Sequence, residues 1–279
     1  MPGQRHFVER HFDYQLRVDS LAAGVRRVFP LPIQTDAPFL ARSVALVQNQ
    51  DATDFDNLQI QFTDNKQAFR IGGLANVFDG TVGGYITGPD SGRGGNFTPI
   101  YPQIPFPRDG EFLITLSNPT VAAMVNIRII FRGVKLFEPG VVWSPTYPVG
   151  GHREIPNDFT LGFTVTDSQT LNNRVVAPNF GTDFVYRCGQ ILENFDSNAY
   201  GNMEAILRDH QGRAYSNDWI HVNYLFGRLM AERPGIIYPE IYIPNQQALF
   251  FDIRRTDSVI APGDVTMNLA FKGAQVLPL

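Results

Sequence analysis

Cysteine, lysine and charged residues in general are scarce in this chain of 279 residues. The single cysteine, Cys188, excludes an internal disulfide framework and any cysteine-rich zinc site. It lies in an apolar, strand-like run, which predicts a buried small hydrophobe. Charged residues make up 18% of the chain, below the usual share of about 25%.

A basic surface of the kind that binds nucleic acid is also missing. The net charge is −4, and the arginines are scattered except for the pairs Arg26–Arg27 and Arg254–Arg255. We interpret these pairs as charges on solvated strand faces or edges. The composition therefore predicts no direct contact with nucleic acid.

Long hydrophobic runs are absent. No segment approaches the roughly 20 consecutive apolar residues that a membrane-spanning helix requires. The segment Met1–Arg10 is polar and charged, unlike a secretory signal peptide. We expect a soluble protein without a membrane span, made in a cytoplasm.

Catalytic and metal-binding signatures are lacking as well. No Gly-x-Ser-x-Gly elbow occurs, and the glycine-rich stretches in residues 80–95 match neither a P-loop nor a dinucleotide-binding fingerprint. The histidines have no zinc-binding spacing; they are His6, His11, His152, His210 and His221. We expect no enzyme, no catalytic residue, no cofactor and no metal. A glycosidase pair of carboxylates is the one arrangement that pattern leaves open.

Two clusters of side chains are ambiguous. Three aspartates crowd one segment (Asp51, Asp54 and Asp56), and a later segment offers Asp196, Asn198 and Asn202. Such residues can bind calcium, but they also favour turns, and we interpret both segments as turns. Four aromatic residues could stack on sugars: Tyr101, Trp219, Tyr238 and Tyr242. We favour a role for them in filling cores and covering seams.

Phenylalanine, glycine and proline are abundant, with 22, 25 and 20 copies. The many glycines and prolines predict frequent turns. Hydrophobic residues make up 43% of the chain, enough for a core in each of two domains of about 130 residues.

The chain repeats itself at an offset of about 145 residues. Residues 14–64 can be laid on residues 159–209 without a gap, and apolar and polar residues alternate in both copies. The second half of each copy matches at a slightly smaller offset. Both copies end in a Phe-basic-Gly sequence: Phe131-Arg132-Gly133 and Phe271-Lys272-Gly273. Because a period of two is typical of half-buried strands, the sequence predicts a duplicated β-domain.

The predicted fold is all-β, with two tandem jelly-roll-like β-sandwich domains and short helices in loops. The expected organisation is an N-terminal arm (1–13), a first sandwich (14–137), a Pro/Gly-rich linker (138–158) and a second sandwich (159–279). The apolar end, 274–279, is expected to be a second arm. Helical spacing of apolar residues predicts a helix over 221–233 and a shorter counterpart at Leu74, Val77 and Phe78.

The first domain resembles a family of bacteriophage virion proteins of jelly-roll type. Four segments carry the resemblance: Asn76–Thr81, Ile104–Arg108, Phe112–Asn118 and Asn126–Phe137. The second domain departs from the pattern, since Gly80-Thr81 has no clear equivalent there. The resemblance implies a capsid-decorating or head-to-tail accessory protein, located in the virion. Its implied partners are the major capsid protein or copies of itself as a homo-oligomer.

Two other functions fit the same features. Two jelly rolls in one chain also resemble the major capsid proteins of tailless, membrane-containing viruses, which form pseudo-hexameric trimers. A carbohydrate-binding module for host recognition is the alternative from another class of protein.

Overall fold

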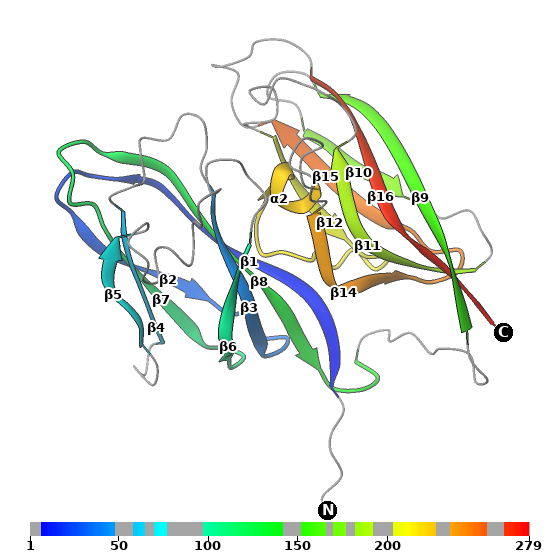
Figure 1. The fold of residues 1–279 in the computed structure, drawn as a ribbon, viewed down its shortest axis with the longest axis horizontal. Helices are drawn as coiled ribbons and strands as arrows, with labels where there is room; N and C mark the ends of the chain where they lie inside the picture. Colours follow the sequence, from blue (N-terminus) through cyan, green and yellow to red (C-terminus); the bar gives the residue numbers. More distant parts are fainter. Residues whose placement is uncertain are drawn as a thin grey trace, which may run out of the picture. The chain divides into compact units, whose positions relative to one another are not determined.

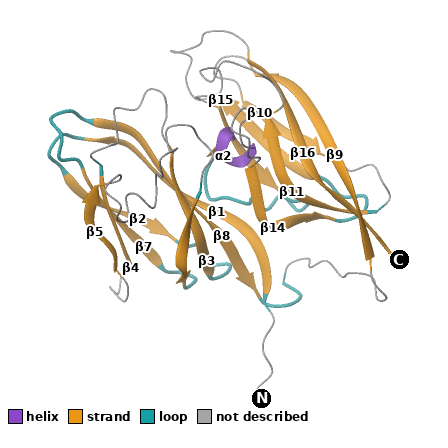
Figure 2. Ribbon diagram, viewed as in Figure 1, coloured by secondary structure: helices purple, strands orange, loops and turns teal. Residues whose placement is uncertain are grey.

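Nearly all of the described chain consists of β-strands. The structure is a computed structural model that describes residues 7–47, 58–64, 70–76, 97–141, 152–165, 170–176, 182–191, 203–226, 235–255 and 265–278. Within this part the only helix is α2 (Val222–Phe226), drawn in purple in Figure 2. The chain divides into two compact units. One comprises Phe12–Phe137, and the other comprises Glu138–Leu279 together with the described residues up to His11.

The first unit contains two four-stranded antiparallel sheets (Figure 1). One sheet has the order β1 (Val8–Leu21), β8 (Met124–Phe137), β3 (Phe39–Val47) and β6 (Thr98–Phe106). The other has the order β2 (Arg26–Pro32), β7 (Glu111–Ser117), β4 (Gln59–Asp64) and β5 (Arg70–Asn76).

The second unit is built from two sheets of the same kind. One has the order β14 (Gly235–Ile243), β11 (Asp183–Ile191), β16 (Val265–Pro278) and β9 (His152–Val165). The other has the order β10 (Thr170–Val176), β15 (Leu249–Arg255), β12 (Met203–Arg208) and β13 (Ile220–His221).

Each unit has the strand order of a jelly roll. In both, the first, eighth, third and sixth strands form one sheet, and the second, seventh, fourth and fifth form the other. This arrangement of eight antiparallel strands in two sheets is the jelly-roll topology. The all-β sandwich fold expected from the sequence is confirmed.

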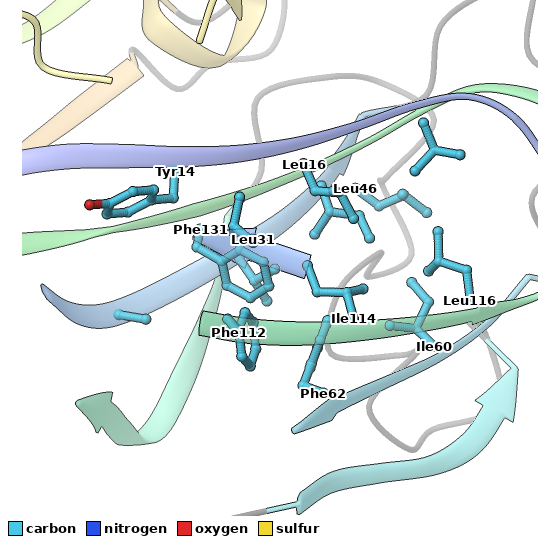
Figure 3. Packing of buried hydrophobic residues seen from close by; sticks show 14 of the residues in the cluster. Tyr14, Leu16, Leu31, Leu46, Ile60, Phe62, Phe112, Ile114, Leu116 and Phe131 are labelled. Atoms are coloured by element: carbon cyan, nitrogen blue, oxygen red, sulfur yellow. The ribbon is translucent and has the colours of Figure 1, made fainter. Parts of the chain in front are cut away.

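Alternating apolar residues build the core of the first unit. Figure 3 shows side chains from β1, β2, β3, β4, β7 and β8 converging between the two sheets. The rings of Phe62, Phe112 and Phe131 form a closed trio with centroids 4.9–5.4 Å apart. Each such pair contributes about 0.5–1.5 kcal/mol beyond the burial of its surface, so this trio is a main stabilising element of the sandwich.

The two units share a β-bulge at the same place. In the pairing of β3 with β8, Ala41 lies opposite Gly133 and Ser43 opposite Arg132, so that Arg42 is skipped. In the pairing of β11 with β16, Tyr186 lies opposite Gly273 and Cys188 opposite Lys272, so that Arg187 is skipped. The two Phe-basic-Gly sequences therefore occupy the same register in their sheets.

The helices differ from the sequence prediction. In the described residues, α2 covers only Val222–Phe226 of the helix expected over 221–233, and residues 227–233 lie outside the described part. Leu74, expected in a helix, lies in strand β5. The apolar spacing of three and four residues was misleading there, because a strand that pairs with β4 satisfies the backbone hydrogen bonds equally well.

The chain ends and the linker also differ from expectation. Strand β1 begins at Val8, and Phe12 and Asp13 are buried, so the segment expected to be an arm contributes to the sandwich. Strand β16 continues to Pro278 with Ala274 and Val276 buried. Strand β9 begins at His152 within the expected linker and pairs with the end of β16. Each of these segments gains a ladder of hydrogen bonds that free arms would lack.

Candidate functional site

A buried carboxylate marks the face of strand β12 that points away from the core. Met203, Ala205 and Leu207 form the apolar series expected from the sequence, and Glu204 lies between them on the opposite face. Glu204 is nonetheless 0% exposed. A carboxylate removed from water to this degree requires a charged partner, because its desolvation costs several kcal/mol.

The partner is Arg254 on the neighbouring strand β15. Glu204 and Arg254 are directly opposite in the register of the two strands. Arg254 donates from Nε and Nη2 to the same oxygen, Glu204 Oε2, at 2.9 and 2.7 Å. The guanidinium also lies over the ring of Trp219, with 4.4 Å between Cζ and the ring centroid. One edge and one face of the guanidinium are therefore fixed.

The same sheet carries a second ion pair and a histidine. Arg208 donates from Nε to Asp252 Oδ2 at 2.9 Å, across the same two strands. His221 on β13 lies directly opposite Glu204 and is buried. Residues opposite one another in an antiparallel pair share a face, so His221, Glu204 and Arg254 form one row across three strands.

This row belongs to the second unit alone. The register position of Glu204 and Arg254 is occupied in the first unit by Gln59 and Ser117, which also lie opposite one another. The first unit thus has the same backbone arrangement without the charges. We call the residues His221, Glu204, Arg254 and Trp219 the Trp219 cluster.

The first unit has a different charged cluster, around the buried ammonium of Lys135. Its Nζ donates to both carboxylate oxygens of Asp36 at 2.8 Å and to Gln34 Oε1. The ammonium also lies 3.8 Å from the centroid of the Phe12 ring. The pKa of Tyr14 nearby is raised well above its usual value, chiefly by burial. These contacts join β8 to the segment between β2 and β3.

A second buried ion pair joins β1 and β8. Arg132 donates from Nε and Nη2 to the two oxygens of Asp13 at 3.0 and 2.9 Å, and its guanidinium stacks on Phe97 at 3.9 Å. In the second unit, Asp158 and Lys272 are direct neighbours across β9 and β16. A bidentate Arg–carboxylate pair of this kind fixes the geometry of two strands.

An arginine at the bulge of the second unit links three strands. Arg187 on β11 donates to Glu240 on β14 at 3.0 Å and to Glu154 on β9 at 2.7 Å. Strand β16 lies between β11 and β9, so this side chain crosses a whole strand. The hydrogen bond from Arg187 lowers the pKa of Glu154, and the same bond raises the pKa of Arg187.

The four aromatic residues singled out in the sequence lie on different elements. Trp219 lies beside the sheet that contains β12 and β15, whereas Tyr238 and Tyr242 lie on β14 in the other sheet of the unit. Tyr101 is on β6 in the first unit. Only Trp219 is part of a charged cluster that the structure describes.

The other residues considered in the sequence are dispersed. The segments with Asp51, Asp54 and Asp56, with Asp196, Asn198 and Asn202, and the glycine-rich residues 80–95 lie outside the described part, as does His6. His11 is buried in β1, His152 begins β9 and His210 lies in the turn after β12. Cys188 is partly exposed rather than fully buried, because it follows the bulge in β11.

The two arginine pairs have unequal surroundings. Arg26 and Arg27 are exposed on β2, as expected. Arg255 is 4% exposed, so the expectation of a solvated charge is wrong for this residue, whereas Arg254 is partly exposed and paired with Glu204. The sequence signals that pointed toward the Trp219 cluster were Trp219 and the arginine pair. Glu204 was missed because its alternating position predicts exposure.

The described residues contain no group of three or more His, Cys, Asp or Glu side chains arranged to hold a metal ion. No helix in that part is long and apolar enough to cross a membrane. The Trp219 cluster can instead offer hydrogen-bond donors and an aromatic surface.

Comparison with known proteins gives no family. No family model matches the sequence, and no curated protein matches it. Among solved structures, the chain is similar to one from the triple jelly roll fold and turret assembly in an archaeal virus, with 11% identity and a TM-score of 0.27. That match covers 94% of this chain and 59% of the other, so this chain spans about three fifths of the length of that chain.

Two further structures illustrate the range of similar chains. A chain of the PBCV-1 virus capsid is 9% identical, with 99% of this chain and 96% of that chain covered and a TM-score of 0.26. The ANXUR2 extracellular domain of Arabidopsis thaliana is 11% identical, with 91% and 83% covered and a TM-score of 0.24. The jelly-roll assignment rests on the strand order of the chain itself.

Proposed function

We propose that this chain is a structural component of a bacteriophage particle, bound to the capsid as a decorating or head-to-tail accessory protein. The observation that carries the proposal is the presence of two jelly rolls with the same strand order in one chain. Its second support is the resemblance of the first unit to jelly-roll virion proteins, seen in segments that form β6, β7 and β8.

The contacts within each unit suit a component of a virus particle. Virion proteins must keep their shape while contacts form on several sides. The buried ion pairs of Asp13 with Arg132 and of Glu204 with Arg254 fix strand register within each sandwich. Such pairs add geometric specificity more than net stability, which is what a repeating assembly requires.

The edge strand β2 is protected against uncontrolled pairing. It lies at the end of its sheet and contains Pro30 and Pro32, which lack an N–H to donate to another strand. Edge strands blocked in this way do not extend a sheet into a neighbouring molecule. Contacts between copies at this edge would then form through side chains, which set a defined geometry.

The test is quantitative mass spectrometry of purified phage particles. We expect the protein to co-sediment with the particles in a fixed ratio to a separate major capsid protein. Particles that lack the gene should still form shells. Absence of the protein from purified particles would contradict the proposal.

A double jelly-roll major capsid protein is the second candidate, because two such units in one chain are also the plan of those capsomers. In that case the protein itself would be the most abundant particle protein, and shells would not form without it. Light scattering of the purified protein adds a second readout, since a capsomer of this kind is a trimer.

A further inference from the structure

Arg254 has donors that its known partners do not use. Its Nε and Nη2 atoms are turned toward Glu204 Oε2, and its Cζ lies over the Trp219 ring. Among the described residues no interaction of Nη1 is found. A guanidinium has five N–H donors in a planar fork, so the end formed by Nη1 and the second Nη2 hydrogen remains available.

The side chain that carries this end is partly exposed to solvent. The Arg254 side chain is 26% exposed, whereas its partner Glu204 is 0% exposed. The exposed fraction therefore belongs to the arginine, and the carboxylate that holds it is hidden beneath. Trp219 is itself only partly buried.

The cluster is fixed before any ligand arrives. The buried carboxylate sets the orientation of the guanidinium, and the indole restricts it from one face. A long side chain that is already immobilised loses little conformational entropy on binding. Arg187 in the same unit instead divides the same two donors, Nε and Nη2, between two carboxylates, those of Glu240 and Glu154.

The local charge does not oppose an anionic ligand. Arg254 is balanced by Glu204, and Arg208 beside it is balanced by Asp252. The Arg208 side chain is 33% exposed and Asp252 only 9%, so in this pair too the cation is the more accessible partner. On β15, Asp252 lies two residues from Arg254, and on β12, Arg208 lies four residues from Glu204, so the backbone positions of the two arginines are roughly 13 Å apart along the strands at the usual rise.

We propose that the Trp219 cluster binds a carboxylate-bearing sugar of a glycan, which goes beyond the structural role proposed above. The N–H groups of Nη1 and Nη2 at the end of the Arg254 guanidinium can donate in parallel to the two oxygens of a planar carboxylate. The exposed part of the Trp219 indole supplies an apolar surface for the pyranose ring. Arg208 can donate to a residue further along the same glycan.

The sugar class follows from the two groups together. An aromatic surface alone would accept a neutral sugar, and an isolated arginine would accept any small anion. A uronic or sialic acid residue satisfies both, because it carries a carboxylate on a ring with an apolar face. The first unit has Gln59 and Ser117 at this register position, so it should not bind the same ligand.

The experiment uses the full chain and a glycan array with glucuronate- and sialate-containing oligosaccharides beside their neutral analogues. Glycans that bind are then titrated in solution against the Trp143→Phe variant. This variant retains only one of the two tryptophans of the chain, Trp219. We expect binding of acidic oligosaccharides with a change in Trp219 fluorescence and no comparable binding of the neutral analogues.

Three variants test the site, each checked for an unchanged circular dichroism spectrum and melting temperature. Arg254→Lys keeps a cation beside Glu204 but removes the fork, and we expect about tenfold weaker binding, the typical effect of losing one charged hydrogen bond. Trp219→Ala should weaken binding similarly, measured by calorimetry. The matched control, Arg187→Lys on the other sheet, should bind like the parent.

Several results would overturn the proposal. No binding of any acidic glycan up to low millimolar concentration would do so, as would equal binding of neutral analogues. Unchanged affinity in Arg254→Lys and Trp219→Ala would place the glycan elsewhere. These outcomes are independent of whether the protein is found in phage particles, so each proposal can fail without the other.

Discussion

Gly133 lies against the carbonyl oxygen of Leu40, so close that a Cβ atom on this residue would collide with that oxygen and with the ring of Phe39. Gly273 lies in the same way against the carbonyl of Val185 and the ring of Phe184. In both units the glycine lies opposite the residue that directly precedes the bulge: Gly133 lies opposite Ala41, and Gly273 lies opposite Tyr186. The matched glycines therefore have one physical cause, the close approach of two backbones beneath an aromatic ring.

Gly273→Ala should destabilise the second unit by about 2 kcal/mol, because the added methyl must displace backbone rather than a flexible side chain. Urea unfolding followed by circular dichroism measures the loss. Gly162→Ala on β9 is the control, since its added methyl would meet only the side chain of Asn268, which can rotate away. Equal losses in the two variants would contradict the account of Gly273.

Removing the carboxylate of Asp36 should cost more than removing the ammonium it holds. Lys135 is 2% exposed and would lose its carboxylate partner in Asp36→Ala while remaining buried, at a cost of about 2–3 kcal/mol. Asp36 is 48% exposed, so in Lys135→Met it remains in contact with water. We expect that variant to lose about 1 kcal/mol or less.

The double variant Lys135→Met with Asp36→Ala completes the cycle. Its unfolding free energy in urea should equal that of Lys135→Met, because the carboxylate has little effect once the ammonium is gone. If Asp36→Ala is no less stable than Lys135→Met, the ammonium is stabilised mainly by Gln34 and the Phe12 ring instead.

The strands could largely be predicted from the sequence, because the alternation of apolar and polar residues leaves few choices for which side chains face the core. Once Ile60 and Phe62 face the core, their partners Leu116 and Ile114 must lie on the same face of the sheet. The two Phe-basic-Gly sequences identified the last strands of the two copies as equivalent, and the structure places them in the same register. The ion pairs were not accessible, since Glu204 and Arg254 are fifty residues apart in the chain. Their contact depends on which strands are neighbours.

The alternation of β8 was predicted wrongly at one point. The alternation of Val125, Ile127 and Ile129 in the sequence predicts that all three face the core, but Met124 is the buried residue, at 1% exposed, and Val125 is partly exposed. Asn126 between them has a φ of 55°. A residue with a left-handed backbone conformation shifts the alternation by one position, so that side chains before it point to the opposite face of the sheet. Asparagine adopts this conformation more readily than most residues.

Asn126→Ala should therefore lower the unfolding free energy of the first unit by about 1 kcal/mol, the usual cost of a left-handed conformation for a residue with a Cβ and no local polar contact. Asn126→Gly is the matched control, because glycine adopts this φ without strain, and it should be nearly neutral. Thermal melting of both variants decides the point. A larger loss in the glycine variant would show that the asparagine side chain, rather than the backbone, is what stabilises β8.

The alkaline limit of the second unit should depend on Tyr215. Burial raises the pKa of Tyr215 to about 12, and the residue is 7% exposed. A tyrosine in an unfolded chain has a pKa of about 10. The folded state therefore holds the proton more tightly. Its contribution to stability is complete below pH 10 and is lost between pH 10 and pH 12.

Tyr215→Phe removes this titration, so its unfolding free energy should fall less steeply with pH over that interval than that of the parent. The expected difference is on the order of 2 kcal/mol by pH 12, from 1.36 kcal/mol for each unit of pKa. Urea unfolding at stepped pH values gives both curves, and tyrosinate absorbance gives the titration of the folded protein. Parallel curves for the two proteins would mean that the pKa of Tyr215 is the same in the folded and unfolded states. Other groups would then set the alkaline limit.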